Sequence, residues 1–273
     1  MTTFSSADGT VLHEALWTAT SPRAVVALLH GYGEHIGRYD HVGSALANAG
    51  LSVYGCDLRG HGRSAGPRGH IRHFSEYLDD AEALVSRART SGLPLFVLGH
   101  SNGGLIATHH VLERPAGVVG IVLSSPFFGL KLAVPALKVA AGRIASRVYP
   151  GLKLPSGLHG MDVSRDPGVQ RDYDNDPLNN KYATARWFTE TTAAQQAAYK
   201  RAPALTVPCL VLQGGADRIA DPARTQAVAA RFGSQDKTVT VLPGQFHEIF
   251  NEPEADRTAT LARVTQWITS HLG

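Results

Sequence analysis

The chain has 273 residues, 43% of them hydrophobic and 18% charged, with a formal net charge of +3. This length allows one large α/β domain, and the composition is ordinary for a globular protein. Because the basic residues are scattered, no nucleic-acid partner is expected. The N-terminus lacks the regions of a signal peptide, and no apolar run approaches the roughly 18 residues of a membrane span. We therefore expect a cytoplasmic protein and leave open whether its surface contacts membranes.

Strand-like and helix-like patterns alternate through the first 125 residues. Residues 1–20 predict a hairpin that turns at Asp8-Gly9. The later strands are predicted at 24–29, 51–56, 95–98 and 118–124, and the helices at about 40–49, 75–90 and 102–113. This alternation indicates a mostly parallel sheet with helices on both faces. Cys56 and Cys209 fall in apolar strand-like runs and are expected to be buried free thiols.

The segment Gly99-His100-Ser101-Asn102-Gly103 is the most informative motif in the chain. Its G-x-S-x-G pattern is weak by itself, but here it lies between a predicted strand and a predicted helix. In that context the pattern predicts a nucleophile elbow, a sharp turn that lifts one serine clear of the sheet. The glycines are needed because strand and helix approach closely at such a turn. We therefore predict Ser101 as a nucleophile.

The alternation of predicted strands and helices stops between about Pro126 and Pro203, where prolines and glycines interrupt the pattern. Within this segment the polar run Asp172–Asn180 predicts a loop. Strands are again predicted at 209–212 and 238–242, and an amphipathic helix at about 255–271. We therefore divide the chain into an α/β core, residues 1–125 and 204–273, and an inserted helical cap, residues 126–203. The cap is expected over the C-terminal edge of the sheet, where open α/β sheets keep their sites.

A serine nucleophile needs a base, and the base needs an acid to orient it. After such an elbow the acid comes first in the chain and a histidine follows. Asp217 stands at the tip of the strand at 209–212 and is preferred to Asp221, four residues further on. His247 follows the strand at 238–242 at the same sheet edge, whereas His271 lies at the end of the last helix. His100 adjoins Ser101 and is expected to pack behind the turn.

Acyl transfer also requires N–H donors for the oxyanion that develops on the substrate. The backbone amide of Asn102 follows the nucleophile and begins a helix, so the helix dipole adds to its effect. The second donor should come from the loop after the strand at 24–29, where Tyr32 has the right position. Both contributions come from the backbone, so the side chains at these positions matter less.

One helix of the cap has an amphipathic pattern. Its apolar residues, at spacings of three and four, are Leu130, Val134, Leu137, Ala141, Ile144 and Val148, and its basic residues are Lys131, Lys138, Arg143 and Arg147. Two interpretations remain open. The apolar stripe packs onto the domain as an ordinary lid, or the helix is a mobile basic lid that touches lipid and admits acyl chains.

Several segments together resemble the monoacylglycerol lipase family of α/β-hydrolases. They are His30-Gly-Tyr-Gly-Glu-His-Ile-Gly-Arg-Tyr39, Asp57-Leu-Arg-Gly-His-Gly-Arg-Ser64, Gly99-His-Ser-Asn-Gly-Gly104, Asp176-Pro-Leu178, Leu212-Gln-Gly-Gly-Ala-Asp-Arg218 and the stretch around His247. The resemblance spans nearly the whole chain. It implies the α/β-hydrolase fold, with a mostly parallel eight-stranded sheet, helices on both faces and an inserted helical cap.

The resemblance also implies the triad Ser101, Asp217 and His247, in agreement with the reading of the residues. It further implies that Glu34 and Arg38 line the polar end of the pocket and contact the glycerol group. A structural ion pair between Glu34 and Arg38 is the alternative. Phe250 stands where some relatives have a second histidine, so a glycerol hydrogen bond from that position is missing here.

We therefore expect a serine carboxylester hydrolase that cleaves monoacylglycerols through an acyl-enzyme, with no metal or organic cofactor. The partners expected are a small lipid ester and a transient lipid surface at the cap. The enzymatic alternative is a lysophospholipase or a broad-specificity short-chain carboxylesterase. The alternative from another class is a ligand-binding receptor on a hydrolase fold, against which the complete triad argues.

Overall fold

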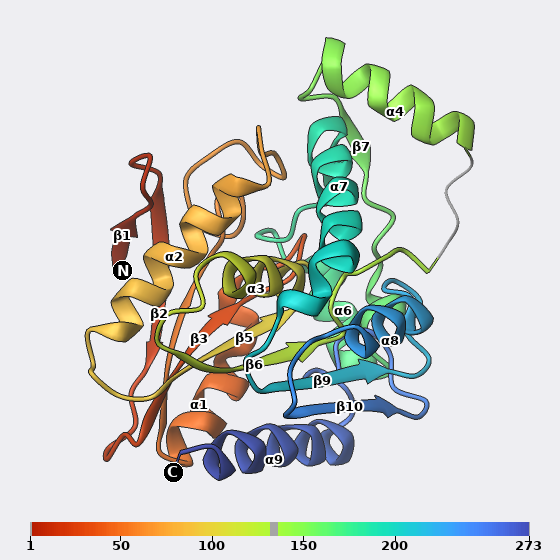
Figure 1. The fold of residues 1–273 in the computed structure, drawn as a ribbon. Coiled ribbons are helices and arrows are strands. Elements are labelled where there is room, and N and C mark those ends of the chain that lie inside the picture. Colours follow the sequence, from red (N-terminus) through yellow and green to blue (C-terminus); the bar gives the residue numbers. More distant parts are fainter. Residues whose placement is uncertain (1, 132–135, 273) are drawn as a thin grey trace.

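A computed structural model of the protein describes residues 2–131 and 136–272. Eight strands form one sheet in the order β1-β2-β4-β3-β5-β6-β9-β10 (Figure 1). The strands are β1 (Thr3–Ser5), β2 (Val11–Trp17), β3 (Ala24–Leu29), β4 (Leu51–Cys56), β5 (Leu95–His100), β6 (Val118–Ser124), β9 (Cys209–Gly214) and β10 (Lys237–Leu242). Strands β4, β3, β5, β6, β9 and β10 run parallel to one another, whereas β2 pairs antiparallel with both β1 and β4. The predicted mostly parallel eight-stranded sheet is confirmed.

The central strands are apolar throughout because helices cover both faces of the sheet. All six residues of β3 are buried, and successive side chains enter opposite layers. Val25, Ala27 and Leu29 join one core cluster. Ala24, Val26 and Leu28 join the other. A continuous apolar run is therefore the sequence signature of a strand buried from both sides.

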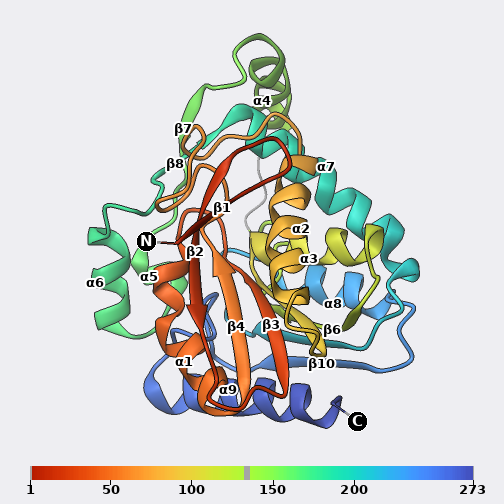
Figure 2. The ribbon, with the colours of Figure 1, turned by 90° about the vertical axis from the view of Figure 1, so that its left-hand side faces the viewer.

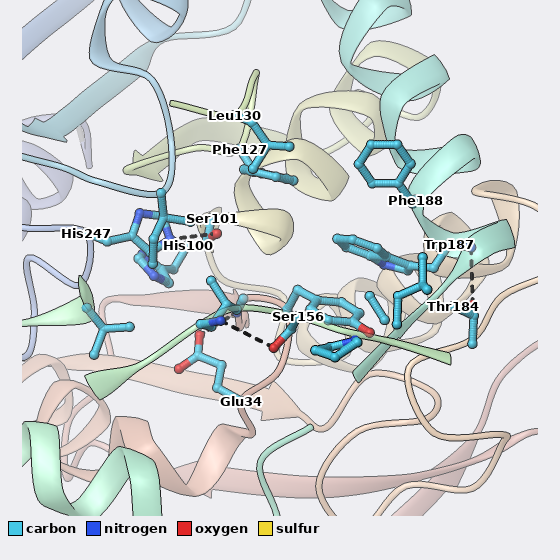
Figure 3. A pocket seen from close by; sticks show the side chains of 18 of the residues that line it. Glu34, His100, Ser101, Phe127, Leu130, Ser156, Thr184, Trp187, Phe188 and His247 are labelled. Atoms are coloured by element: carbon cyan, nitrogen blue, oxygen red, sulfur yellow. Dashed lines mark hydrogen bonds between the residues drawn. The ribbon is translucent and has the colours of Figure 1, made fainter. Parts of the chain in front are cut away.

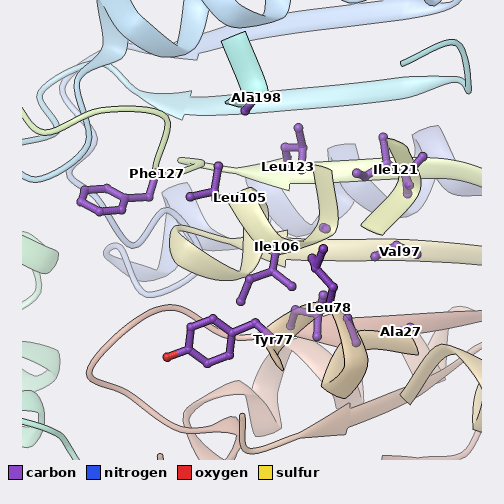
Figure 4. Close-up of a cluster of buried hydrophobic side chains, with 14 of the residues drawn as sticks. Ala27, Tyr77, Leu78, Val97, Leu105, Ile106, Ile121, Leu123, Phe127 and Ala198 are labelled. Carbon is purple, nitrogen blue, oxygen red and sulfur yellow. The ribbon is translucent and has the colours of Figure 1, made fainter. Parts of the chain in front are cut away.

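The helices divide between these two layers (Figure 2). Helices α1 (Asp40–Asn48) and α9 (Glu254–Ser270) cover one face. The other face is covered by α2 (Ser75–Arg89), α3 (Asn102–Glu113), α8 (Pro222–Ala230) and the C-terminal half of α7 (Ala185–Arg201). Figure 4 shows side chains of α2 and α3, among them Leu78 and Ile106, meeting those of the central strands. Both cysteines are buried free thiols.

Between β6 and β9 the chain forms the segment that we call the cap segment, residues 126–203. It contains α4 (Ala136–Val148), β7 (Lys153–Pro155), α5 (Gly160–Val163), α6 (Pro167–Asn175), β8 (Tyr182–Thr184) and α7. β7 and β8 pair antiparallel as a small second sheet that the sequence did not predict.

The predicted loop at Asp172–Asn180 is wrong for its first part, because residues through Asn175 belong to α6. The helix begins earlier, where the Asp166 side chain accepts the amides of Gly168 and Val169 and Pro167 occupies the first turn. An aspartate cap followed by proline is a strong helix start. The polar composition of the run obscured this signal.

The α4 helix lies at the tip of the molecule, beside the upper part of α7 and away from the sheet (Figure 1). The helix predicted from Leu130 begins only at Ala136, and Leu130 instead forms an isolated bridge to Ala220. Within α4 the apolar stripe does not pack onto the domain at its C-terminal end, since Ile144 is 66% and Val148 80% exposed. Instead the buried Ser146 faces α7 and bonds to Thr189 at 2.8 Å. Val134 of the stripe lies outside the described residues. None of the helices in the described part is both long and apolar enough to cross a bilayer.

Candidate active site

Ser101 sits at the turn between β5 and α3 with a left-handed backbone, at φ 52° and ψ −118°. Such a conformation is strained for a residue with a side chain. The flanking glycines permit it. A Cβ at Gly99 would lie 2.4 Å from the carbonyl oxygen of Gly103, and one at Gly103 would lie 2.1 Å from that of Leu29. The close approach of strand and helix therefore requires glycine at both positions and carries the serine hydroxyl to the C-terminal edge of the sheet.

The structure brings Ser101, His247 and Asp217 into one chain of hydrogen bonds. His247 Nε2 lies 2.8 Å from Ser101 Oγ, a contact drawn in Figure 3, and His247 Nδ1 lies 2.8 Å from Asp217 Oδ2. All three residues are buried. Asp217 is held in turn by the amides of Ile219 and Ala220, which donate to its Oδ1 at 2.8 and 2.9 Å. This arrangement can deprotonate the serine hydroxyl and stabilise the imidazolium that forms.

Two of the rival residues, Asp221 and His271, lie away from Ser101, whereas His100 lies beside the site. Asp221 caps α8 by accepting the amide of Ala223. His271 contacts Asp236 at 2.9 Å at the end of α9. His100 lies next to His247 with 4.8 Å between ring centroids, and its Nδ1 bonds to Ser124 Oγ at 3.0 Å. Burial and the neighbouring His247 lower the pKa of His100 to about 4, so this ring stays neutral at ordinary pH.

The electrostatic environment of His247 differs from that of His100. Burial by itself lowers the pKa of the His247 imidazole, but the charge of Asp217 and the hydrogen bond to it outweigh burial. The net result is a pKa raised above the ordinary value of 6.5. A base with a raised pKa holds the proton of the attacking hydroxyl more firmly.

The backbone amides of Tyr32 and Asn102 both border the serine. Gly31 is packed so closely that a Cβ on it would lie 3.1 Å from Ser101 Cβ. Asn102 is the first residue of α3. Within the described chain, neither the Tyr32 nor the Asn102 amide has a protein acceptor. Two free N–H groups beside a nucleophile can receive a developing negative charge.

Glu34 and Arg38 form a buried network beneath this loop. Glu34 Oε1 accepts the amide of Gly31 at 2.5 Å and the hydroxyl of Tyr39 at 2.7 Å. Arg38 donates to Glu34 Oε2 at 2.8 Å and to both carboxylate oxygens of Glu248 at 2.6 and 2.7 Å. Burial raises the pKa of Glu34, but the charge of Arg38, the neighbouring histidines and the hydrogen bond from Tyr39 together outweigh burial, so the net pKa is lowered and the carboxylate stays ionised.

A cavity of about 470 Å³ opens beside Ser101 (Figure 3). Most of its wall is apolar and comes from Phe127, Leu130, Leu158, Trp187, Phe188 and Ile219. Its polar wall comes from Glu34, His100, Ser156, Tyr173 and Glu248. Of the two residues expected to bind substrate, Glu34 lines the cavity, whereas Arg38 lies behind it and is not among the described lining residues.

Sequence reasoning missed most of these lining residues, among them Glu248, Tyr173 and Trp187. Glu248 could have been found, because it follows the candidate base directly and lies at the same sheet edge. Tyr173 belongs to the end of α6, which falls in the predicted loop at Asp172–Asn180. Trp187 gave no signal, since an aromatic residue in a cap helix indicates packing more often than a site.

The chain matches known proteins along nearly its whole length. The family profile described as "Serine aminopeptidase, S33" matches residues 20–254. The monoacylglycerol lipase of Mycolicibacterium smegmatis is 39% identical over 98% of this chain and 96% of its own. The phospholipase YtpA of Bacillus subtilis is 36% identical over 90% of this chain and 96% of its own. The crystal structure of Paleococcus ferrophilus monoacylglycerol lipase, 33% identical, superposes with a TM-score of 0.87 over 95% of this chain and 99% of that one.

Proposed function

The chain belongs to the monoacylglycerol lipase family of α/β-hydrolases, and from this premise we propose that it cleaves monoacylglycerols to a free fatty acid and glycerol. The observation that carries the proposal is the continuous contact Ser101–His247–Asp217 at the mouth of an apolar cavity. The apolar wall suits an acyl chain, and the polar wall suits a glycerol head group.

In the proposed mechanism Ser101 Oγ attacks the ester carbonyl carbon while His247 Nε2 takes the hydroxyl proton. Asp217 holds the imidazole through its Nδ1–H and stabilises the imidazolium. The carbonyl oxygen becomes an oxyanion, which accepts hydrogen bonds from the amides of Tyr32 and Asn102. As the intermediate collapses, the carbon–oxygen bond to glycerol breaks and His247 gives its proton to the departing oxygen.

The resulting acyl-enzyme is hydrolysed by the same groups. His247 takes a proton from water as the water oxygen attacks the acyl carbon. A second oxyanion forms in the same place, and its collapse breaks the bond to Ser101. His247 returns the proton to the Ser101 oxygen, and the fatty acid leaves.

The charge of the polar wall favours a neutral head group over a phosphate. Glu34 and Glu248 carry two negative charges, and the single positive charge of Arg38 already pairs with both. No lysine or arginine occurs among the described residues that line the cavity. A phosphate placed here would face a net negative charge at low dielectric, which is unfavourable. This favours monoacylglycerols over the lysophospholipid alternative.

We further propose that the cap segment contacts lipid surfaces through α4. The exposed Ile144, Val148 and Tyr149 form an apolar edge there, and Arg143 and Arg147 lie on the same helix. Exposed apolar side chains beside basic ones are typical of helices that rest in a membrane interface. The protein would then be peripheral at the membrane while it takes up substrate.

Hydrolysis of p-nitrophenyl butyrate by the wild type and by Ser101→Ala tests the reaction. We expect the wild type to release p-nitrophenol and Ser101→Ala to lose nearly all activity, and equal rates would refute the mechanism. Monoacylglycerol and lysophosphatidylcholine of the same acyl chain then test the head group. A higher kcat/KM for the phospholipid would refute the electrostatic argument and favour the alternative substrate.

A further inference from the structure

The side chain of Tyr32 joins the oxyanion loop to the cap segment. Its hydroxyl donates to the carbonyl oxygen of Tyr182 at 2.6 Å, and the carbonyl oxygen of Gly69 lies 3.3 Å away as a weaker second acceptor. Tyr182 begins β8 in the cap segment, whereas Gly69 belongs to the loop after β4. Tyr32 is only 8% exposed, so this hydrogen bond forms away from water, where it is strong.

The ring of Tyr32 makes a second contact with the cap segment. It packs on Trp187, with 3.8 Å between ring centroids and 36° between planes. Trp187 lies in the first turn of α7, where its amide donates to the side chain of the capping residue Thr184, as Figure 3 shows. Trp187 is also stacked parallel to Phe127 at 6.5 Å. Tyr32 therefore rests on two consecutive cap elements, β8 and the start of α7.

Gly69 leaves the space in which this junction forms. A Cβ at that position would lie 2.5 Å from Tyr32 Oη and 2.8 Å from the carbonyl oxygen of Tyr182. The carbonyl of Gly69 also accepts from the amide and the hydroxyl of Thr184, at 3.3 and 3.2 Å. Three segments distant in sequence thus meet at the hydroxyl of one tyrosine.

We propose that Tyr32 is a positioning residue through which the cap segment holds one oxyanion donor in place. The inference rests on the proposed function, which assigns that donor to the Tyr32 amide. The amide and the side chain share one Cα, so an anchor on the ring and hydroxyl limits how the N–H can turn. Glu34 restrains the preceding peptide by accepting the amide of Gly31. The oxyanion hole is therefore complete only when β8 and α7 are seated against the loop.

Two variants break the junction from different sides, and each has a matched control. Tyr32→Phe removes the hydroxyl that bonds to the cap and keeps the ring on Trp187. Its control is Tyr182→Phe, which removes an exposed hydroxyl and keeps the carbonyl that accepts from Tyr32. Gly69→Ala inserts a Cβ into the junction. Gly92→Ala imposes the same backbone strain, φ +69° against φ +61°, with nothing within 4 Å of the new atom.

Three measurements separate positioning from a merely structural role. The kcat for p-nitrophenyl butyrate reports the reaction. The Ki of an alkylboronic acid, which forms a tetrahedral adduct on Ser101, reports the oxyanion hole. The Ki of a monoalkylglycerol ether, which cannot be hydrolysed, reports ground-state binding. A displacement of about 1 Å at a catalytic group costs up to about a hundredfold in rate, so we expect kcat to fall at least tenfold in Tyr32→Phe and Gly69→Ala.

In the expected result the boronate Ki rises in proportion to the loss of kcat, the ether Ki stays unchanged, and both controls behave as wild type. The proposal is overturned if Tyr32→Phe keeps kcat within about twofold of wild type, or if the boronate and ether Ki values rise together. Tyr32→Phe decides the matter even where Gly69→Ala fails to fold. A wild type that hydrolyses no ester refutes the proposed function, whereas an active wild type matched by Tyr32→Phe refutes this inference alone.

Discussion

Glu34→Gln tests the buried network beneath the oxyanion loop, because it changes charge with little change in size. All three groups that face the carboxylate are donors, namely the Gly31 amide, the Tyr39 hydroxyl and the Arg38 guanidinium. A glutamine can accept through one oxygen only and turns its NH₂ toward the remaining donors. At least one hydrogen bond to a charged acceptor is lost, and one buried donor is left unpaired.

The size of the effect follows from burial. Glu34 is 2% exposed, so solvent offers little compensation. Removing one partner of a buried ion pair destabilises a protein by about 3–5 kcal/mol. We expect about 3 kcal/mol, because Arg38 keeps its two bonds to Glu248. For a chain of this size each kcal/mol lowers the Tm by about 2–4 °C, so the Tm should fall by about 6–12 °C. The kcat should fall too, since the His30–Gly31 peptide, which precedes the Tyr32 amide, loses its restraint.

Urea unfolding and p-nitrophenyl butyrate hydrolysis measure the two effects. Glu113→Gln is the matched control, because Glu113 pairs with Arg201 at 2.8 Å on the surface. Exposed pairs of this kind contribute about 0–1 kcal/mol. A free-energy loss for Glu34→Gln no larger than that of Glu113→Gln, with kcat intact, would refute the role assigned to the network.

The remaining predictions concern the base, the second oxyanion donor and the cap. The kcat/KM should rise with pH as His247 loses its proton, with an apparent pKa above 6.5. Asp217→Asn should shift that midpoint downward, because burial still lowers the pKa of His247 while the charge of Asp217 no longer raises it. The same variant should lower kcat by about 10⁴-fold. The control Asp221→Asn should change neither quantity, and an unshifted midpoint in Asp217→Asn would contradict the assignment. Asn102→Ala should keep kcat within about threefold, because the donor is the backbone amide. The Tm of this variant should hold or rise, since both polar atoms of the Asn102 side chain are buried without a partner among the described residues. A hundredfold loss of kcat would instead show that the side chain takes part in the reaction. Ile144→Glu should weaken binding to phosphatidylglycerol vesicles in a flotation assay and spare the hydrolysis of soluble esters, and undiminished flotation would count against the α4 surface.

The sheet could be predicted from the sequence because its signals are local and strong. A parallel strand covered on both faces must be apolar at every position, as β3 is, and this leaves an unbroken run that pattern reading detects. The site residues could be predicted for a related reason. Parallel strands end at one edge, so residues that follow β5, β9 and β10 are brought near one another by the fold itself.

The cap segment was harder to predict because its elements are short and depend on distant partners. β7 and β8 have three residues each, too few to show a period of two. In α4 the apolar spacing is correct for a helix, but the spacing does not say what the stripe faces. Its neighbour α7 is contacted through Ser146, a small polar residue, and the apolar residues Ile144 and Val148 remain exposed. Periodicity thus predicts a helix but not the environment of each of its faces.

The boundary between core and cap shows a further limit of reading along the chain. The division at residues 126 and 203 lies where the alternating strand and helix pattern of the sequence stops and resumes, and it stays a prediction. In the structure, the amide of Glu248 donates to the carbonyl of Val163 at 2.8 Å, and Arg165 Nε donates to Glu252 at 2.7 Å. Glu252 in turn accepts the amide of Phe246, the residue before His247, at 2.6 Å. The cap segment therefore helps to hold the loop of the catalytic histidine, so the unit that supports the chemistry crosses the boundary that the sequence pattern draws.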